Sequence, residues 1–151
     1  PHVDVWRKPI VAILSTGDEI IAPGEPMQPA KVYDSNAQVL ADAVRELGCE
    51  PLRMGIAHDD LATLRRRMHD ALAAADVVLL SGGTSKGAGD LSYRVVGELR
   101  DPGIVAHGVA LKPGKPICLA ATAKHVLRDL LIPQAETSAH PHHHLLQHKR
   151  R

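Results

Sequence analysis

The residues from Ser81 to Asp90 combine glycines, hydroxyl side chains and one carboxylate, and they directly follow the apolar run 77–80. Small residues after a buried strand leave backbone N–H groups free to point at an anion, as phosphate-binding loops do. Asp90 would repel a phosphate there unless a divalent cation or a proton lay between them. The stretch therefore predicts a phosphorylated ligand held with Mg²⁺. The alternative interpretation is that Asp90 only caps the helix that follows.

A second turn carries two adjacent carboxylates. The apolar run 11–14 is typical of a buried strand, and it ends in Ser15-Thr16-Gly17-Asp18-Glu19. Open α/β sheets hold their ligands at this position, beyond the carboxyl end of a strand. The alternative is a solvated turn in which Asp18 bonds its own backbone.

Lys112 and Lys115 form a third candidate site. Pro113, Gly114 and Pro116 hold the two ammonium groups in a short rigid turn that suits an oxyanion. The same prolines also fit an exposed turn that ends one strand and begins the next.

Alternating strands and helices must position these turns. We expect strands over 10–15, 51–57, 77–81, 104–109 and 117–121, and helices over 35–47, 61–72 and 90–99. This order is typical of a three-layer α/β/α sandwich with a mostly parallel sheet. Because loops that follow parallel strands emerge on one side, Glu19, Asp59 and Asp90 should converge at one edge.

The first helix carries its own start and stop signals. The hydroxyl of Ser35 can cap its first turn, with Gln38 closing a capping box. Apolar residues then recur at helical spacing until Gly48, which predicts the end of the helix there.

Other polar residues have ordinary interpretations. We interpret His58 and His107 as solvated or hydrogen-bonded side chains, and the arginine run 65–67 as the solvated face of a helix. Cys49 and Cys118 lack the spacing of a metal site, so we interpret them as small apolar residues.

Composition limits the function classes. The 151 residues are 44% hydrophobic, which is typical of one globular domain. A net charge of +1, without a basic stripe interleaved with aromatics, argues against a nucleic-acid partner. No apolar run is long enough to span a membrane and no signal peptide is evident, so we expect a cytoplasmic protein without a membrane partner.

Six motifs follow the order and spacing of one family. They are Ser15-Thr16-Gly17-Asp18-Glu19-Ile20, Pro23-Gly24-Glu25-Pro26, Tyr33-Asp34-Ser35-Asn36, Gly55-Ile56-Ala57-His58-Asp59-Asp60, Ser81-Gly82-Gly83-Thr84-Ser85 with Asp90, and Lys112-Pro113-Gly114-Lys115-Pro116. Over about residues 6–121, the chain resembles the molybdopterin-binding domain of the molybdopterin molybdenumtransferases, which include the MoeA proteins and the E domain of gephyrin.

The resemblance implies a MogA/MoeA-like molybdopterin-binding fold and a role in molybdenum cofactor biosynthesis. The substrates would be adenylated molybdopterin and molybdate, and the cofactor Mg²⁺. Glu19, Asp59 and Asp90 match acids needed for activity, and we expect Asp90 and Glu19 to hold the metal. The lysines Lys112 and Lys115 would bind molybdate. The ligand-binding turns would be Ser15, Thr16, Gly17 and Asp18, and Gly82, Gly83, Thr84 and Ser85.

Two other functions stay open. The same fold serves MogA/MoaB-like enzymes, which adenylylate molybdopterin and use a similar cradle. A molybdopterin-binding scaffold module without catalysis is the second. The proline-rich segment 23–29 and the Lys112–Pro116 turn favour the transferase.

The chain departs from the family pattern after about residue 123. We expect residues 1–9 to be a linker from a longer parent chain, 10–123 the molybdopterin-binding domain, and 124–151 a divergent tail that is disordered or frameshifted. Six of the ten histidines lie in that tail, but without the partner spacing of a metal site. The parent would be a homo-oligomeric molybdenumtransferase, and we expect the fragment to bind its ligand without catalysing the reaction.

Overall fold

The computed structural model describes residues 2–82, 88–109 and 117–123. Its elements run in the order β1 (Ile10–Thr16), β2 (Ile20–Ile21), β3 (Val32–Tyr33), α1 (Asn36–Glu46), β4 (Glu50–Ala57), α2 (Leu61–Ala74), β5 (Val77–Gly82), α3 (Ala88–Val96), β6 (Gly103–Val109) and β7 (Ile117–Ala121). In these ranges no helix has both the length and the apolar character needed to cross a membrane.

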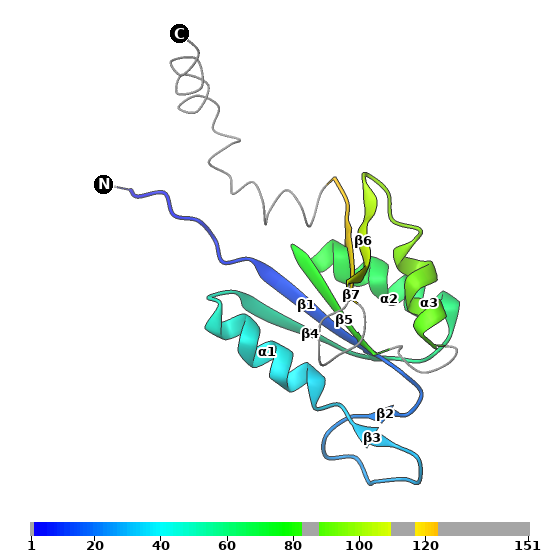
Figure 1. The fold of residues 1–151 in the computed structure, drawn as a ribbon. Coiled ribbons are helices and arrows are strands. Elements are labelled where there is room, and N and C mark those ends of the chain that lie inside the picture. Colours follow the sequence, from blue (N-terminus) through cyan, green and yellow to red (C-terminus); the bar gives the residue numbers. More distant parts are fainter. Residues whose placement is uncertain (1, 83–87, 110–116, 124–151) are drawn as a thin grey trace.

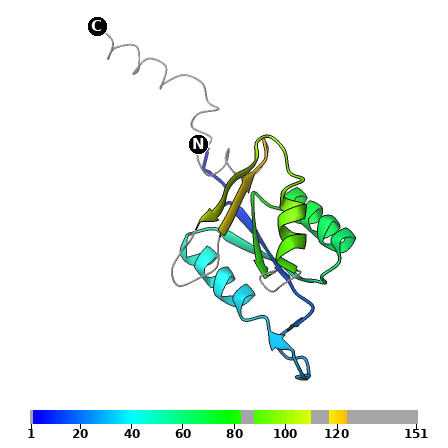
Figure 2. The same ribbon diagram turned by 45° about the vertical axis from the view of Figure 1, so that its right-hand side comes forward.

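A parallel sheet in the order β4-β1-β5 forms the middle layer. Figures 1 and 2 show α1 on one face of this sheet and α2 with α3 on the other. The expected α/β/α sandwich is therefore confirmed. Consecutive parallel strands joined by helices place all the strand-ending loops at one edge.

The central strand β1 is buried on both faces because successive side chains point to opposite sides. Val11 and Ile13 pack in one cluster with the buried face of α1. Leu14 packs in a second cluster with Leu64 and Met68 of α2. An uninterrupted apolar run is what such a doubly covered strand requires.

The start of α1 differs from the prediction. Asp34 caps the helix, because its Oδ1 accepts the Ala37 N–H at 3.1 Å, whereas Ser35 makes no side-chain cap bond. Ser35 already has helical dihedral angles (φ −77°, ψ −29°), and a capping residue needs an extended backbone. Gln38 donates to Asp42 instead of closing a capping box. The predicted end is confirmed, since α1 stops before Gly48, whose φ is +79°.

Further differences concern the other elements. The connection after β1 contains the short parallel strands β2 and β3, which sequence reasoning missed. Strands β6 and β7 form, but they pair with each other in an antiparallel sheet of their own. Helix α3 already includes Ala88, so Asp90 is its third residue and does not precede it. It ends at Val96 instead of near residue 99.

Strand β4 contains one extra residue relative to β1. Ile13 pairs with Arg53, but the next residue, Leu14, pairs with Gly55, so Met54 has no partner in the ladder. Gly55 has a φ of +79°, a backbone conformation that glycine adopts without steric cost. This β-bulge shifts the register of all later residues of β4.

Candidate functional site

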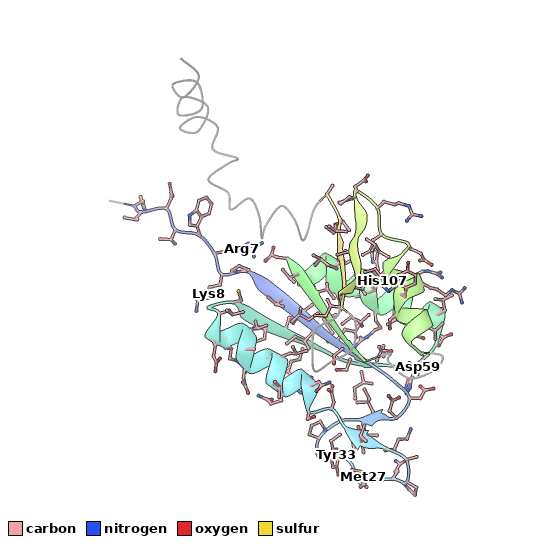
Figure 3. The ribbon with its side chains drawn as sticks, viewed as in Figure 1. Arg7, Lys8, Met27, Tyr33, Asp59 and His107 are labelled. Atoms are coloured by element: carbon pink, nitrogen blue, oxygen red, sulfur yellow. The ribbon has the colours of Figure 1, made fainter. Side chains whose placement is uncertain are left out.

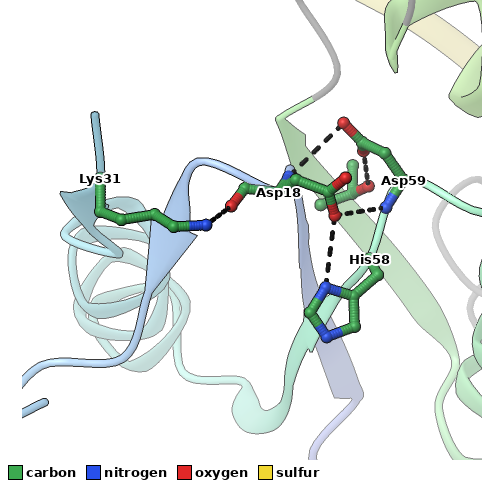
Figure 4. A network of polar contacts seen from close by, with 5 residues as sticks. Asp18, Lys31, His58 and Asp59 are labelled. Carbon is green, nitrogen blue, oxygen red and sulfur yellow. Dashed lines mark hydrogen bonds and ion pairs between the residues drawn. The ribbon is translucent and has the colours of Figure 1, made fainter. Parts of the chain in front are cut away.

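The loops after β1 and β4 are bonded to each other at the carboxyl edge of the sheet. The Asp59 N–H donates to Asp18 Oδ1 at 3.1 Å, and the Asp18 N–H points back to Asp59 Oδ2 at 3.5 Å. The hydroxyl of Thr16 donates to Asp59 Oδ1 at 3.2 Å. Figure 4 shows this exchange. The structure therefore brings Asp59 together with the turn at residues 16–18.

Basic groups border Asp18. His58 Nδ1 lies 3.3 Å from Asp18 Oδ1, and Lys31 Nζ donates to the Asp18 carbonyl. The N–H of Asp59 is the main reason that the pKa of Asp18 lies below its ordinary value, and His58 and Lys31 lower it further. The Asp18 carboxylate is therefore charged at neutral pH and fixes the backbone of the neighbouring loop.

Glu19 lies over the same turn. A Cβ placed on Gly17 would come within 2.6 Å of Glu19 Oε2, so this carboxylate bends back over the glycine. Glu19 thus shares the edge with Asp18 and Asp59. Within the described ranges, however, no three His, Cys, Asp or Glu side chains are arranged to hold a metal ion.

Strand β5 reaches this edge through a glycine. A Cβ on Gly82 would lie 1.9 Å from the Thr16 carbonyl oxygen, and the φ of Gly82 is +115°. Only glycine lets β5 approach β1 so closely where the predicted phosphate cradle begins. Three predicted cradle residues, Gly83, Thr84 and Ser85, lie outside the described residues, as do Lys112 and Lys115.

Polar side chains also meet on the α1 side of the edge. Ser15 pairs with Ser81 in the β1–β5 ladder, and Ser81 Oγ accepts a hydrogen bond from Asn36 Nδ2 at 3.2 Å. Ser15 is 1% exposed, and its Oγ has no hydrogen-bond partner among the residues that the structure describes. A buried hydroxyl without a partner can still form a hydrogen bond with another group.

Comparison with known families identifies the family of this domain. The family model described as "Probable molybdopterin binding domain" matches residues 12–132. The chain belongs to this family. The match covers the carboxyl edge formed by β1, β4 and β5, and it confirms the resemblance carried by the six motifs.

Relatives of this family domain are longer proteins. A molybdopterin molybdenumtransferase from Nostoc sp. is 40% identical over 120 residues, covering 80% of this chain and 27% of that protein. One from Haemophilus influenzae is 33% identical over 115 residues, covering 76% and 28%. The chain thus spans little more than a quarter of the curated relatives that it matches.

A solved structure supports the fold of this family domain. The crystal structure of the MoeA molybdopterin biosynthesis protein from Pyrococcus horikosii superposes with a TM-score of 0.69 at 41% identity. The superposition covers 81% of this chain and 30% of that one. The predicted MoeA-like fold is therefore confirmed.

Some polar residues lie away from the carboxyl edge. His107 packs against Tyr93 with ring centroids 4.6 Å apart, and Figure 3 labels it by strand β6. Arg65 pairs with Glu98, and Arg67 donates to the Met54 carbonyl. The arginine run therefore includes two residues that tie elements together, where the sequence suggested only a solvated face.

Sequence reasoning missed one residue of this edge. Asn36 was given no role in the site, although it stands in a family motif, whereas its partner Ser81 begins the predicted phosphate-binding stretch. Their contact joins positions 45 residues apart, so no local spacing could reveal it.

Proposed function

We propose that this domain binds adenylated molybdopterin at the carboxyl edge of β1, β4 and β5. In the longer parent, the domain would take part in molybdenum cofactor biosynthesis, in the Mg²⁺-dependent transfer of molybdenum from molybdate to molybdopterin. The observation that carries the proposal is the reciprocal hydrogen bonding between Asp18 and Asp59, which fixes acidic groups beside the glycine turn at Gly82. Membership of the molybdopterin-binding family supports it.

The roles of the residues divide by their chemistry. Asp90 would hold Mg²⁺ and neighbour the ligand phosphates, while Glu19 and Asp59 order water or the metal. Backbone N–H groups of the glycine turns would bind the phosphates. Lys112 and Lys115 would hold molybdate through charge-assisted hydrogen bonds.

The donor set suits Mg²⁺. Glu19 and Asp59 supply hard carboxylate oxygens, and protein-bound Mg²⁺ typically uses one or two carboxylates together with substrate phosphates and water. This agrees with the lack of a ready three-ligand group among the described residues. When bound, Mg²⁺ would neutralise charge on the phosphates during cleavage of the adenylate.

Asp59 is held for such a task. Its two oxygens accept hydrogen bonds from neutral donors, the Thr16 hydroxyl and the Asp18 N–H. Neutral donors orient a carboxylate and leave its negative charge uncompensated, so the charge stays available to a cation or to a water that it polarises.

A binding experiment tests the proposal. Molybdopterin and its adenylate are titrated into the chain with and without Mg²⁺, and into the variants Asp59→Asn and Asp70→Asn. Asp70 is an exposed acid on α2 and serves as the control. We expect Asp59→Asn to remove the Mg²⁺-dependent part of the affinity and Asp70→Asn to leave it unchanged.

Other outcomes separate the alternatives. Formation of the adenylate from molybdopterin, Mg²⁺ and ATP would assign the chain to the adenylyltransferases instead. Pterin binding whose affinity depends on neither Mg²⁺ nor Asp59 would favour a scaffold module. No binding of either pterin would refute the proposal.

A further inference from the structure

An open pocket of about 730 Å³ lies between the β2–β3 segment, the start of α1 and strand β4. Its volume is within the usual range for small-molecule sites. Figure 3 shows Tyr33 at the same end of the molecule as Asp59, away from Arg7. The pocket is lined by Ala22, Pro23, Gly24, Tyr33, Asp34, Ser35, Gln38 and Arg53.

Asp34 supplies a buried acceptor to this pocket. The residue is 6% exposed, and its Oδ1 accepts the Ala37 N–H at 3.1 Å. No other hydrogen bond to its carboxylate occurs among the described residues, so acceptor capacity remains. An ionised carboxylate has about four acceptor positions, so Asp34 can accept further hydrogen bonds from a ligand in the pocket.

Arg53 supplies oriented donors. Its Nη1 donates to Gln38 Oε1 at 3.1 Å, and Gln38 Nε2 in turn donates to Asp42 Oδ2 at 2.9 Å. A guanidinium carries five N–H donors in a rigid plane, so this fixed arginine retains donors for a ligand. The pocket thus holds a cationic donor and an anionic acceptor.

We propose that this pocket binds the 2-amino-4-oxopyrimidine edge of a pterin or a guanine. That edge presents an acceptor oxygen beside two donors, N3–H and the 2-amino group. Asp34 would accept from the two donors and Arg53 would donate to the oxygen. Ala22, Pro23 and Tyr33 provide the apolar wall that a planar ring requires.

The pocket lies close to the carboxyl edge. Asn36, two residues after Asp34, bonds Ser81, and Ser81 precedes Gly82 at the start of the glycine turn. A ligand with its ring in the pocket therefore extends past Asn36 toward the acids. This inference rests on the proposed function for its choice of a pterin, and it orients molybdopterin with its phosphate end at that edge.

The test compares ligands whose pyrimidine edges differ in the group at C2. Fluorescence titration follows 6-hydroxymethylpterin and lumazine, the 2,4-dioxopteridine, and calorimetry follows guanosine. In Asp34→Asn, the amide oxygen can still accept the Ala37 N–H. The new amide NH2 is a donor, so it disfavours the donating 2-amino group of the pterin and favours the accepting 2-oxo group of lumazine. We expect pterin affinity to fall by about ten- to a hundredfold, as for loss of a charge-assisted hydrogen bond.

The preference between the ligands is the decisive readout. The unmodified chain should prefer 6-hydroxymethylpterin to lumazine, and Asp34→Asn should reverse that order. A loss of helix capping alone weakens both ligands together and reverses nothing. Arg53→Gln should weaken both about tenfold. The controls Asp70→Asn and Arg66→Gln, at exposed positions of α2, should change neither.

The outcomes also separate this inference from the proposed function. An unchanged preference in Asp34→Asn would overturn the subsite even if molybdopterin binds. Asp34-dependent binding of a pterin or guanosine without binding of molybdopterin would support the subsite and refute the function. Tighter binding of guanosine than of 6-hydroxymethylpterin would assign the pocket to a guanine nucleotide.

Discussion

The two ends of the central sheet treat their carboxylates differently. At the amino edge, Asp76 is 8% exposed, accepts the Ile10 N–H at 2.8 Å and pairs with the guanidinium of Arg7. Its charge is matched by a cation of the same chain. This carboxylate ties the segment before β1 to the start of β5.

At the carboxyl edge, the acids are held mainly by neutral groups. Asp59 accepts from the Thr16 hydroxyl and the Asp18 N–H, and Lys31 donates to a carbonyl of Asp18 instead of its carboxylate. His58 adds positive charge only when it is protonated. The same residue type therefore has its charge matched by a cation at one edge, whereas at the other edge neutral donors orient it without matching its charge.

We expect the largest effect at Gly82, where the backbone contacts Thr16 closely. A substitution there changes the packing at the carboxyl edge without changing its charge. Gly82→Ala places a Cβ 1.9 Å from the Thr16 carbonyl oxygen at a φ of +115°. We expect a loss of about 3 kcal/mol in the free energy of unfolding, measured by urea denaturation.

Gly48→Ala is its matched control. Gly48 also has a positive φ, of +79°, but a Cβ there meets nothing within 4 Å. Backbone strain alone should then cost about 1 kcal/mol. Equal losses in the two variants would show that the contact with Thr16 is unimportant.

Removing the amino-edge carboxylate should cost stability and spare binding. Asp76→Ala leaves the Ile10 N–H without its side-chain acceptor and removes the partner of Arg7. Because the side chain of Arg7 is 61% exposed, solvent screens the ion pair, and we expect a loss of about 2 kcal/mol. Weaker molybdopterin binding by Asp76→Ala, measured where the variant is fully folded, would contradict a purely structural role for Asp76.

Asp59→Ala should show the opposite pattern. The hydrogen bonds that it loses come from neutral donors at a partly exposed edge, so we expect a stability change of less than about 1 kcal/mol. Mg²⁺-dependent affinity for molybdopterin should fall at least about tenfold, measured by calorimetry. A stability loss as large as that of Asp76→Ala would erase the distinction between the edges.

The smallest effect concerns acid pH. The pKa of Asp18 lies below 3.8 in the folded chain, chiefly because the Asp59 N–H donates to its carboxylate. The unfolded chain therefore takes up this proton first as pH falls. The stabilisation is fully present above about pH 5 and is lost as pH falls through the folded pKa. In thermal melts, the gap in Tm between the chain and Asp18→Asn should narrow on acidification, whereas a constant gap would argue against this ionisation.

Short-range patterns sufficed to predict the layers. The run 11–14 is apolar at every position. Successive side chains of a strand point to opposite faces, so a continuous apolar run is required only when both faces of the sheet are covered. The helical spacing that ends at Gly48 likewise predicted α1. These signals are local, because each depends on neighbouring residues alone.

The missed features depend on backbone detail or on distant contacts. The cap of α1 is Asp34 and not the predicted Ser35, because the backbone of Ser35 is already helical. The exchange between Asp18 and Asp59 spans 41 residues. Sequence predicted that these loops meet, since parallel strands end together, but which group bonds which depends on the register.

The extra residue in β4 decides which side chain enters the site. With Met54 outside the ladder, Ala57 pairs with Thr16, and Asp59 follows two residues later. If Met54 entered the ladder opposite Leu14, Ile56 would lie opposite Thr16, and His58 would take the place of Asp59. The bulge at Met54 and Gly55, and not only the composition of β4, therefore decides which side chain follows the strand into the site.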